Sequence, residues 1–208
     1  MKSIKRIARK YLPWNKDRLI GQKLPLTLKQ IWSIRMHLQS AGNVRDLALF
    51  NLAIDSKLRA CDLLQLKVCD VCSEGLVNSR ATVVQQKTRR PVKFEITDRT
   101  KRSIEKWVQT ASLGVSDYLF TSRQQRSPHL SMRQYTRIVS SWVAAIGLDA
   151  SHYGTHSMRR TKPTLIYRQT KNLRAVQLLL GHSKLDSTVR YLGIEIDDAL
   201  EMSEQIDV

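Results

Sequence analysis

The chain has 208 residues, of which 42% are hydrophobic, and its formal net charge is +17 because 35 Lys and Arg residues outnumber 18 Asp and Glu residues. This length allows one domain with a sizeable core and a short arm, and the composition excludes wholesale disorder. The basic surplus predicts a polyanionic partner, with nucleic acid as the leading candidate. An acidic membrane surface is the alternative, but it would favour one basic amphipathic helix, whereas these charges are spread along the chain.

The N-terminal part of the chain predicts a basic arm followed by three helices. Residues 1–23 are rich in Lys and Arg and show no regular period, which indicates an arm rather than part of the domain. A capping-box pattern at Thr27–Gln30 precedes apolar residues at helical spacing, so a helix should start there and end at Gly42. We expect a second helix at residues 43–54 and a short one at residues 60–66.

The middle of the chain predicts strands and then more helices. A strand-rich stretch should begin at Val68, and two alternating strands are expected at residues 81–86 and 91–96. The later helices are expected at residues 98–111, 131–146, 155–168 and from the Asn172 cap to Leu180. Trp32, Trp107 and Trp142 are predicted core residues. Residues 24–194 thus form a mainly α domain with one small antiparallel β-sheet, of the α+β class.

Pro163 lies within the predicted helix at residues 155–168. A proline inside a helix removes one hydrogen bond and clashes with the preceding turn, at a cost of about 3 kcal/mol. The helix should therefore either kink or end and restart. A kink is favoured, because residues 165–167 continue the apolar pattern.

The last segment, residues 195–208, differs from the rest because every charged residue in it is acidic. Its apolar residues would give a helix one hydrophobic face. Such a tail should dock on a basic protein surface. The surface could belong to the same domain or to a neighbouring protomer.

The cysteines and the hydropathy of the chain indicate its redox environment and its location. The three cysteines lie between Cys61 and Cys72, and no second Cys or His pair completes a zinc site with Cys69 and Cys72. We therefore expect reduced thiols, no metal and no cofactor. No apolar run is long enough for a signal peptide or a membrane span. The expected location is the bacterial cytoplasm, at the nucleoid.

Three phrases late in the chain contain residues suited to phosphodiester chemistry. Arg159 follows His156 by three residues, so both side chains share one face of a helix. An arginine fork binds two phosphate oxygens and keeps its proton, whereas an imidazole can titrate near neutral pH. His182 lies in Leu-Gly-His-Ser, and Tyr191 follows it by nine residues. A tyrosine hydroxyl is a nucleophile once it loses its proton.

The ordered set formed by these residues with two upstream ones resembles the catalytic signature of the tyrosine recombinases, the phage-integrase family: Arg59, Lys87, His156, Arg159, His182 and Tyr191. The resemblance implies the tyrosine recombinase catalytic-domain fold. It also implies that Arg59 and Arg159 clamp the scissile phosphate and that Tyr191 attacks it to leave a 3′-phosphotyrosine.

The resemblance assigns roles to the remaining residues as well. His156 would exchange a proton with the tyrosine, and His182 would donate a hydrogen bond to the phosphate. Lys87, in the turn between the two strands, would protonate the departing 5′ oxygen, although a basic hairpin could instead bind only backbone phosphates. Further DNA contacts are expected from Arg89, Arg90 and Arg160.

The predicted function is site-specific recombination of double-stranded DNA by a multimer assembled on paired sites. One alternative is a type IB topoisomerase, which would relax DNA by similar chemistry. The other is a non-catalytic DNA-binding remnant of a longer integrase, because most family members carry a further helical domain upstream that closes around the DNA.

Overall fold

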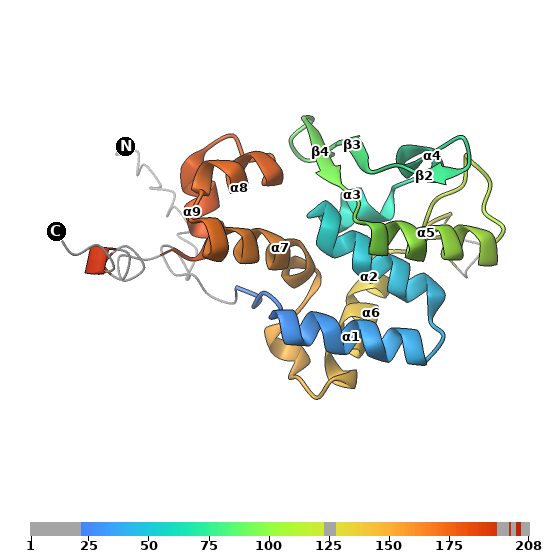
Figure 1. Ribbon diagram of the computed structural model, residues 1–208, viewed down its shortest axis with the longest axis horizontal. Coiled ribbons are helices and arrows are strands. Elements are labelled where there is room, and N and C mark those ends of the chain that lie inside the picture. The colour runs from blue at the N-terminus through green and yellow to red at the C-terminus, as the bar shows by residue number, and fades with distance from the viewer. Residues whose placement is uncertain (1–21, 123–127, 195–199, 201–202, 205–208) are drawn as a thin grey trace, which may run out of the picture.

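The computed structural model describes residues 22–122, 128–194, 200 and 203–204. Helices form most of this part of the chain (Figure 1). They are α1 (Leu28–Ser40), α2 (Val44–Ser56), α3 (Ala60–Leu64), α4 (Val68–Val71), α5 (Asp98–Thr110), α6 (Met132–Ala145), η1 (Ala150–His152), α7 (Thr155–Thr170), α8 (Leu173–Leu180) and α9 (Leu185–Leu192). The strands are β1 (Cys72–Ser73), β2 (Leu76–Val77), β3 (Arg80–Val84) and β4 (Pro91–Glu95). This mainly helical architecture confirms the predicted fold class.

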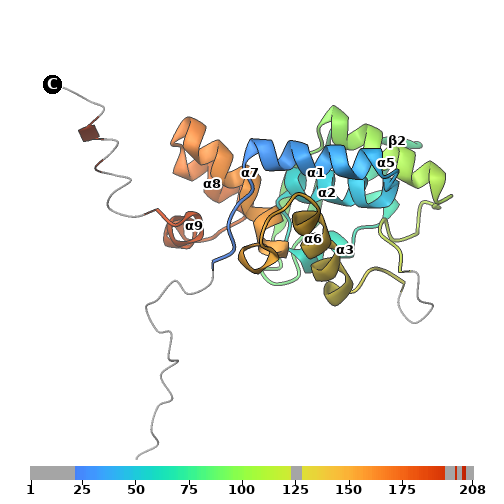
Figure 2. The same cartoon turned by 90° about the horizontal axis from the view of Figure 1, so that it is seen from below.

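Helix α2 is the centre of the packing. It contacts α1, α3, α5 and α7, and its residues from Ala48 to Ser56 are all buried. Figure 2 shows α1 and α5 on one side of the molecule and α6 on the other. The capping box at Thr27 and the positive φ of Gly42, 63°, confirm the predicted limits of α1. Local signals therefore set the helix ends, and burial sets their faces.

The strands form two separate hairpins rather than one sheet. Strand β3 pairs antiparallel with β4, with Ala81 opposite Phe94 and Val83 opposite Val92, which confirms the predicted strand pair. The strand expected from Val68 is wrong, because residues 68–71 form one helical turn in which Asp70 accepts a hydrogen bond from the Lys67 amide. The chain becomes extended only at Cys72, and β1 pairs with β2 alone.

Helix α7 is continuous from Thr155 to Thr170 and includes Pro163, so of the two expected outcomes the less favoured one, a helix that ends and restarts, does not occur. Pro163 is buried, and α7 packs on α2 and α6. One residue earlier, Lys162 makes ion pairs with Asp55 and Glu95. Tertiary contacts therefore offset the local cost of the proline.

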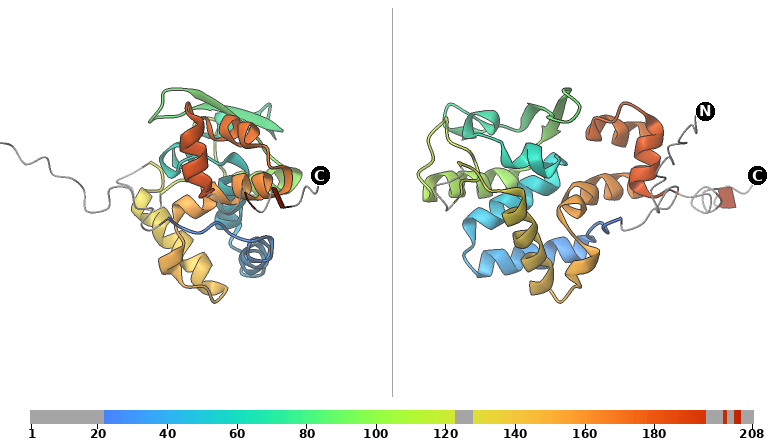
Figure 3. Two further views of the ribbon diagram at one scale, coloured as in Figure 1. Left: turned by 90° about the vertical axis from the view of Figure 1, so that its left-hand side faces the viewer. Right: turned by 180° about the vertical axis from the view of Figure 1, so that it is seen from behind.

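Helices α8 and α9 pack with α7 at one end of the molecule (Figures 1 and 3). Asn172 caps α8 by accepting the Ala175 amide, and Gly181 ends it at a φ of 67°, as predicted. Helix α9, which carries Tyr191, was not predicted. The helix has only eight residues, which are too few for a helical repeat of apolar positions to be recognised in the sequence. Gly193, its C-cap, was the one local signal.

Of the tryptophans predicted to lie in the core, Trp142 is buried but Trp32 is not. Trp142 is buried and contacts the Phe50 ring edge-on at 5.4 Å, as expected. Trp32 is 50% exposed, and the Arg99 guanidinium covers its ring at 4.2 Å. The prediction for Trp32 is therefore wrong, because that ring lies on the outer face of α1.

The predicted arm and tail lie almost entirely outside the described residues. Of the arm, Gln22 and Lys23 are described, and Gln22 donates a hydrogen bond to the Arg190 carbonyl at 2.8 Å. Within the described ranges, no helix combines the length and apolar character needed to cross a membrane.

Candidate active site

Arg59 lies at the sharp connection between α2 and α3. Lys57 adopts the left-handed conformation with a φ of 55°, and Arg59 is the N-cap residue of α3. The buried Lys57 ammonium donates hydrogen bonds to the Asp55 carbonyl at 2.6 Å and to both Glu95 carboxylate oxygens at 3.0 and 2.9 Å. This buried ion pair fixes the turn that presents Arg59.

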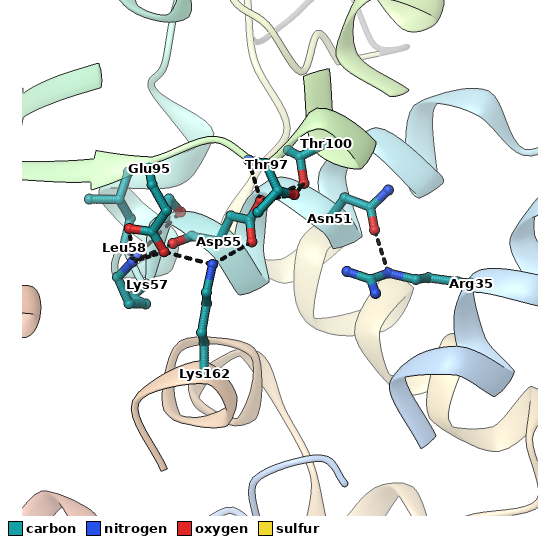
Figure 4. Close-up of polar contacts among 10 residues, drawn as sticks. Arg35, Asn51, Asp55, Lys57, Leu58, Glu95, Thr97, Thr100 and Lys162 are labelled. Atoms are coloured by element: carbon teal, nitrogen blue, oxygen red, sulfur yellow. Dashed lines mark hydrogen bonds and ion pairs between the residues drawn. The ribbon is translucent and has the colours of Figure 1, made fainter. Parts of the chain in front are cut away.

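Asp55 and Lys162 join that turn to α7 (Figure 4). The Lys162 ammonium lies 2.8 Å from Asp55 and 2.6 Å from Glu95. Burial raises the pKa of Asp55, but Lys162 and hydrogen bonds from Thr100 and Thr97 outweigh it and hold that pKa below its usual value. The network links the segments that carry Arg59, the β3–β4 hairpin and Arg159.

Arg59, His156 and Arg159 line one pocket of about 140 Å³, together with the starts of α3 and α6. His156 is exposed in the first turn of α7. Partial desolvation and the charges of Arg159, Arg160 and Arg59 lower its pKa. The imidazole is therefore neutral at neutral pH and can accept a proton.

Tyr191 lies between two guanidinium groups. Its ring centroid is 5.9 Å from Cζ of Arg159 and 5.4 Å from Cζ of Arg160. Burial raises the pKa of Tyr191 to about 12, although both arginines act in the opposite direction. The tyrosine hydroxyl, Nη1 of Arg159 and Nε of Arg160 are buried and make no hydrogen bond of regular geometry to the described protein atoms, although Arg159 is close enough to the hydroxyl to lower the pKa of Tyr191. Burying hydrogen-bonding groups without partners costs free energy, unless a ligand supplies the partners.

His182 contacts Tyr191 edge-on, with 5.4 Å between ring centroids. Its Nδ1 lies 3.1 Å from the Thr188 hydroxyl. Desolvation and the nearby charges of Arg159 and Arg59 lower the pKa of His182 to about 4. The ring is therefore neutral, and in the tautomer that carries its proton on Nε2 the Nδ1 atom accepts a hydrogen bond from the Thr188 hydroxyl.

The structure brings together five of the six predicted catalytic residues but not Lys87. Lys87 is exposed in the β3–β4 turn and does not line the pocket of Arg59, His156 and Arg159. Arg89 and Arg90 are exposed in the same connection. Arg160, predicted as a DNA contact, is instead buried beside Tyr191, with 7% of its surface exposed.

Several polar residues of this region were not predicted, among them Gln85, Thr188 and the Asp55–Lys162 pair. The burial of Gln85 could have been predicted, because it continues the inward-facing positions of Ala81 and Val83 in a strand whose residues alternate between the two faces. Thr188 lies within the predicted Tyr191 phrase. The Asp55–Lys162 pair spans 107 residues and had no local signal. Among the described residues, no cluster of three His, Cys, Asp or Glu side chains is arranged to hold a metal.

The fold and the constellation of arginines, histidines and tyrosine define the class of tyrosine recombinase catalytic domains. A model described as the phage integrase family matches residues 25–195. The chain therefore belongs to the phage integrase family, as its sequence motifs indicated.

The chain is also similar to individual proteins named as integrases or recombinases. The chain is 33% identical over 171 residues to the probable integrase/recombinase YoeC of Bacillus subtilis (strain 168), covering 82% of this chain and 89% of YoeC. It is 32% identical over 193 residues to the tyrosine recombinase XerC of Neisseria gonorrhoeae (strain ATCC 700825 / FA 1090), covering 88% of this chain and 60% of XerC. The crystal structure of XerA recombinase shares the fold with a TM-score of 0.71 at 20% identity, over 88% of this chain and 64% of that one. The chain thus spans less than two thirds of XerC and XerA.

Proposed function

We propose that this chain is a site-specific DNA recombinase in which Tyr191 attacks a backbone phosphate and forms a 3′-phosphotyrosine link. The observation that carries the proposal is the burial of the Tyr191 hydroxyl beside Arg159 and Arg160, in contact with His182. A phenol next to two permanent cations is suited to meet a phosphodiester, since the cations offset the repulsion between nucleophile and phosphate. Family membership favours recombination over topoisomerase-like relaxation.

The phosphate oxygens would be bound by Arg59 and Arg159. Both guanidinium groups reach one pocket, and Arg159 has an unused buried N–H group on Nη1. Negative charge moves onto the non-bridging oxygens during attack, so these contacts strengthen in the transition state. Neutral His182 would add one hydrogen bond from Nε2, because its Nδ1 faces Thr188.

Protons must move for the reaction to proceed. Tyr191 is protonated at rest because its pKa is about 12, and neutral His156 would accept the proton as the phenolic oxygen attacks phosphorus. The Tyr191 Oη–P bond forms and the P–O5′ bond breaks. Lys87 would give its proton to the departing 5′ oxygen. The reverse reaction with another 5′ hydroxyl rejoins the strands, with no net consumption of energy.

Binding along the duplex would use the exposed hairpin. Arg89 and Arg90 are placed to contact backbone phosphates. Arg160 is buried at Tyr191, so its phosphate contact would be at the cleavage site. A protein that acts on DNA in this way would work at the bacterial nucleoid.

Recombination needs two sites held together, and we propose a multimer on DNA. The acidic residues 195–208 would dock on a basic surface of a neighbouring protomer, since charge of one sign in this segment complements a chain of net charge +17. Deleting residues 195–208 should weaken assembly on DNA, measured by analytical ultracentrifugation, more than the affinity of one protomer for one site. Equal losses of both would contradict inter-protomer docking.

The covalent step can be tested with a nicked duplex whose short fragment diffuses away after cleavage and traps the adduct. Because the target site is unknown, the substrates would be a pool of fragments from DNA that flanks the gene. The wild-type protein should give a denaturation-resistant protein–DNA adduct in the presence of a chelator, and Tyr191→Phe should give none. The matched control is Tyr167→Phe, on the same C-terminal group of helices, which should retain the adduct.

An adduct that persists in Tyr191→Phe would show that another residue is the nucleophile. Strong DNA binding by the wild-type protein without any adduct, on a pool shown to contain the recombination site, would favour the non-catalytic remnant instead.

A further inference from the structure

Gln85 is a buried amide in the middle of the proposed catalytic groups. It follows β3 directly, is 1% exposed, and has its side chain among residues from three distant segments. Its Oε1 accepts hydrogen bonds from Nη1 of Arg59 at 2.7 Å and from the Thr88 hydroxyl at 2.9 Å. Its Nε2 donates to the Leu180 carbonyl at 3.4 Å. A buried amide with this many partners is expected to hold them in fixed positions.

The partners settle which way the amide points. A guanidinium group has donors only, so the amide atom that faces Arg59 must be the oxygen. The carbonyl of Leu180 accepts only, so the atom facing it must be the nitrogen. The orientation is therefore fixed by chemistry at both ends, and a flipped amide would lose its contacts with Arg59 and Leu180.

The Leu180 carbonyl connects Gln85 to the second arginine. It also accepts a hydrogen bond from Nη2 of Arg159 at 3.0 Å. Arg59, Gln85, Leu180 and Arg159 thus form one chain of hydrogen bonds that crosses from α3 through the hairpin and the end of α8 to α7.

The close approach of α8 to the hairpin depends on Gly181. A Cβ atom at Gly181 would lie 2.5 Å from the Val92 side chain and 3.6 Å from the Gln85 amide. Only a glycine lets the helix end come this close, and the left-handed φ of 67° also favours it. The backbone of Gln85 further closes the turn, since its amide donates to Arg90 and its carbonyl accepts from Arg89.

We propose that Gln85 is a positioning residue that sets the distance between Arg59 and Arg159, so that both bind the same phosphate, and that orders the turn carrying Lys87. This inference rests on the proposed recombinase function. It assigns to Gln85 no contact with the reacting atoms. Gln85 acts through Arg59 directly, through Arg159 by way of the Leu180 carbonyl, and through Thr88 next to Lys87.

The test compares Gln85→Met with Gln86→Met in the full-length protein. Methionine keeps the length of glutamine but neither accepts from Arg59 strongly nor donates to Leu180, and Gln86 is the exposed neighbour of Gln85. Single-turnover adduct formation at saturating nicked duplex, duplex affinity and thermal unfolding would be measured for both. Gln85→Met should lower the cleavage rate by about a hundredfold, as for a catalytic group displaced by about 1 Å, while affinity stays near that of wild type. Gln86→Met should match wild type throughout.

A second comparison separates positioning from a general structural loss. Arg59→Lys removes the guanidinium donor but keeps the charge. Because Gln85 acts in part through Arg59, Gln85→Met should lower the rate by a smaller factor in the Arg59→Lys background than in the wild-type protein, and the remaining loss would report the routes through Leu180 and Thr88. Losses that multiply in the double variant would overturn the proposal, as would a folded Gln85→Met protein that cleaves as fast as Gln86→Met.

A third variant covers the case in which Gln85→Met does not fold. Gln85→Glu has nearly the same shape and still accepts from Arg59 and Thr88, but its carboxylate would neutralise Arg59 and compete with the phosphate. A folded Gln85→Glu protein with wild-type cleavage would overturn the inference. Absence of an adduct with the wild-type protein would instead overturn the proposed function itself, and the two failures are therefore distinguishable.

Discussion

Burial keeps both His182 and Tyr191 uncharged in the DNA-free protein. The pKa of His182 is lowered to about 4 and that of Tyr191 is raised to about 12, in each case with desolvation as the largest cause. The permanent charges nearby belong to Arg59, Arg159 and Arg160. The site is therefore a set of fixed cations around neutral groups that can exchange protons.

The lowered pKa of His182 predicts a loss of stability in mild acid. Unfolding returns the imidazole to a pKa of about 6.5, so below this pH the unfolded state binds a proton that the folded state does not. The free energy of unfolding should fall between about pH 6.5 and pH 4, by an amount on the order of 1–3 kcal/mol after allowance for partial exposure. Urea unfolding at several pH values would measure this.

His182→Gln should reduce the pH dependence of unfolding and leave the part that His156 contributes, and the matched control is His37→Gln on the exposed surface of α1. A His182→Gln protein with the wild-type slope would show that the histidine is not desolvated in solution.

At the level of elements, the ends and faces of the longer helices could be predicted because their signals are local. The Thr27 capping box, the Asn172 cap and Gly181 all act within a few residues. The errors occurred where tertiary contacts decide. The turn of α4 was read as a strand, Trp32 was placed in the core, and α9 was missed. The continuation of α7 past Pro163 did have a local signal, the apolar pattern of residues 165–167, whereas the contacts of Lys162 that stabilise it are remote in sequence.

The docking of α7 on α2 and β4 should depend strongly on Lys162. Lys162→Met would leave the buried Asp55 carboxylate without its ammonium partner, and removing one member of a buried ion pair costs about 3 kcal/mol or more. Chemical denaturation should show that loss, and single-turnover cleavage should fall as Arg159 loses its fixed place. The matched control is Lys101→Met, whose partner Asp98 is 85% exposed, so that its loss should cost less than about 1 kcal/mol. Equal effects of the two substitutions would contradict the role of the Asp55 network.

At the scale of the whole molecule, the charge, the three C-terminal phrases and the upstream Arg59 were enough to predict the family and to name five residues that lie in one site. The family is confirmed by the match over residues 25–195. The contacts that connect those residues could not be predicted, because they join segments remote in sequence. Gln85 and Leu180 are 95 residues apart, and Lys162 and Asp55 are 107 apart. A sequence motif names the groups, whereas the distances between them arise from packing.

The net charge of +17 predicts DNA affinity that is strongly sensitive to salt. Contacts to about six phosphates would lower affinity by about a thousandfold between 50 and 200 mM salt, through displacement of counterions. Fluorescence anisotropy with a labelled duplex would give the slope of log affinity against log salt concentration, which reports the number of phosphates contacted. The double variant Arg89→Ala, Arg90→Ala should reduce the slope by about two phosphates, with little change in sequence preference. A slope identical to that of wild type would place the hairpin away from the DNA backbone.

The hydrogen bond from Gln22 to the Arg190 carbonyl has a mechanical consequence. It attaches the chain that enters the domain to the last turn of α9, one residue before Tyr191. A force that pulls on the chain before Gln22 therefore acts first on α9, the helix that carries Tyr191. It acts only afterwards on the helices packed around α2. Such a force would act directly on the position of the Tyr191 side chain.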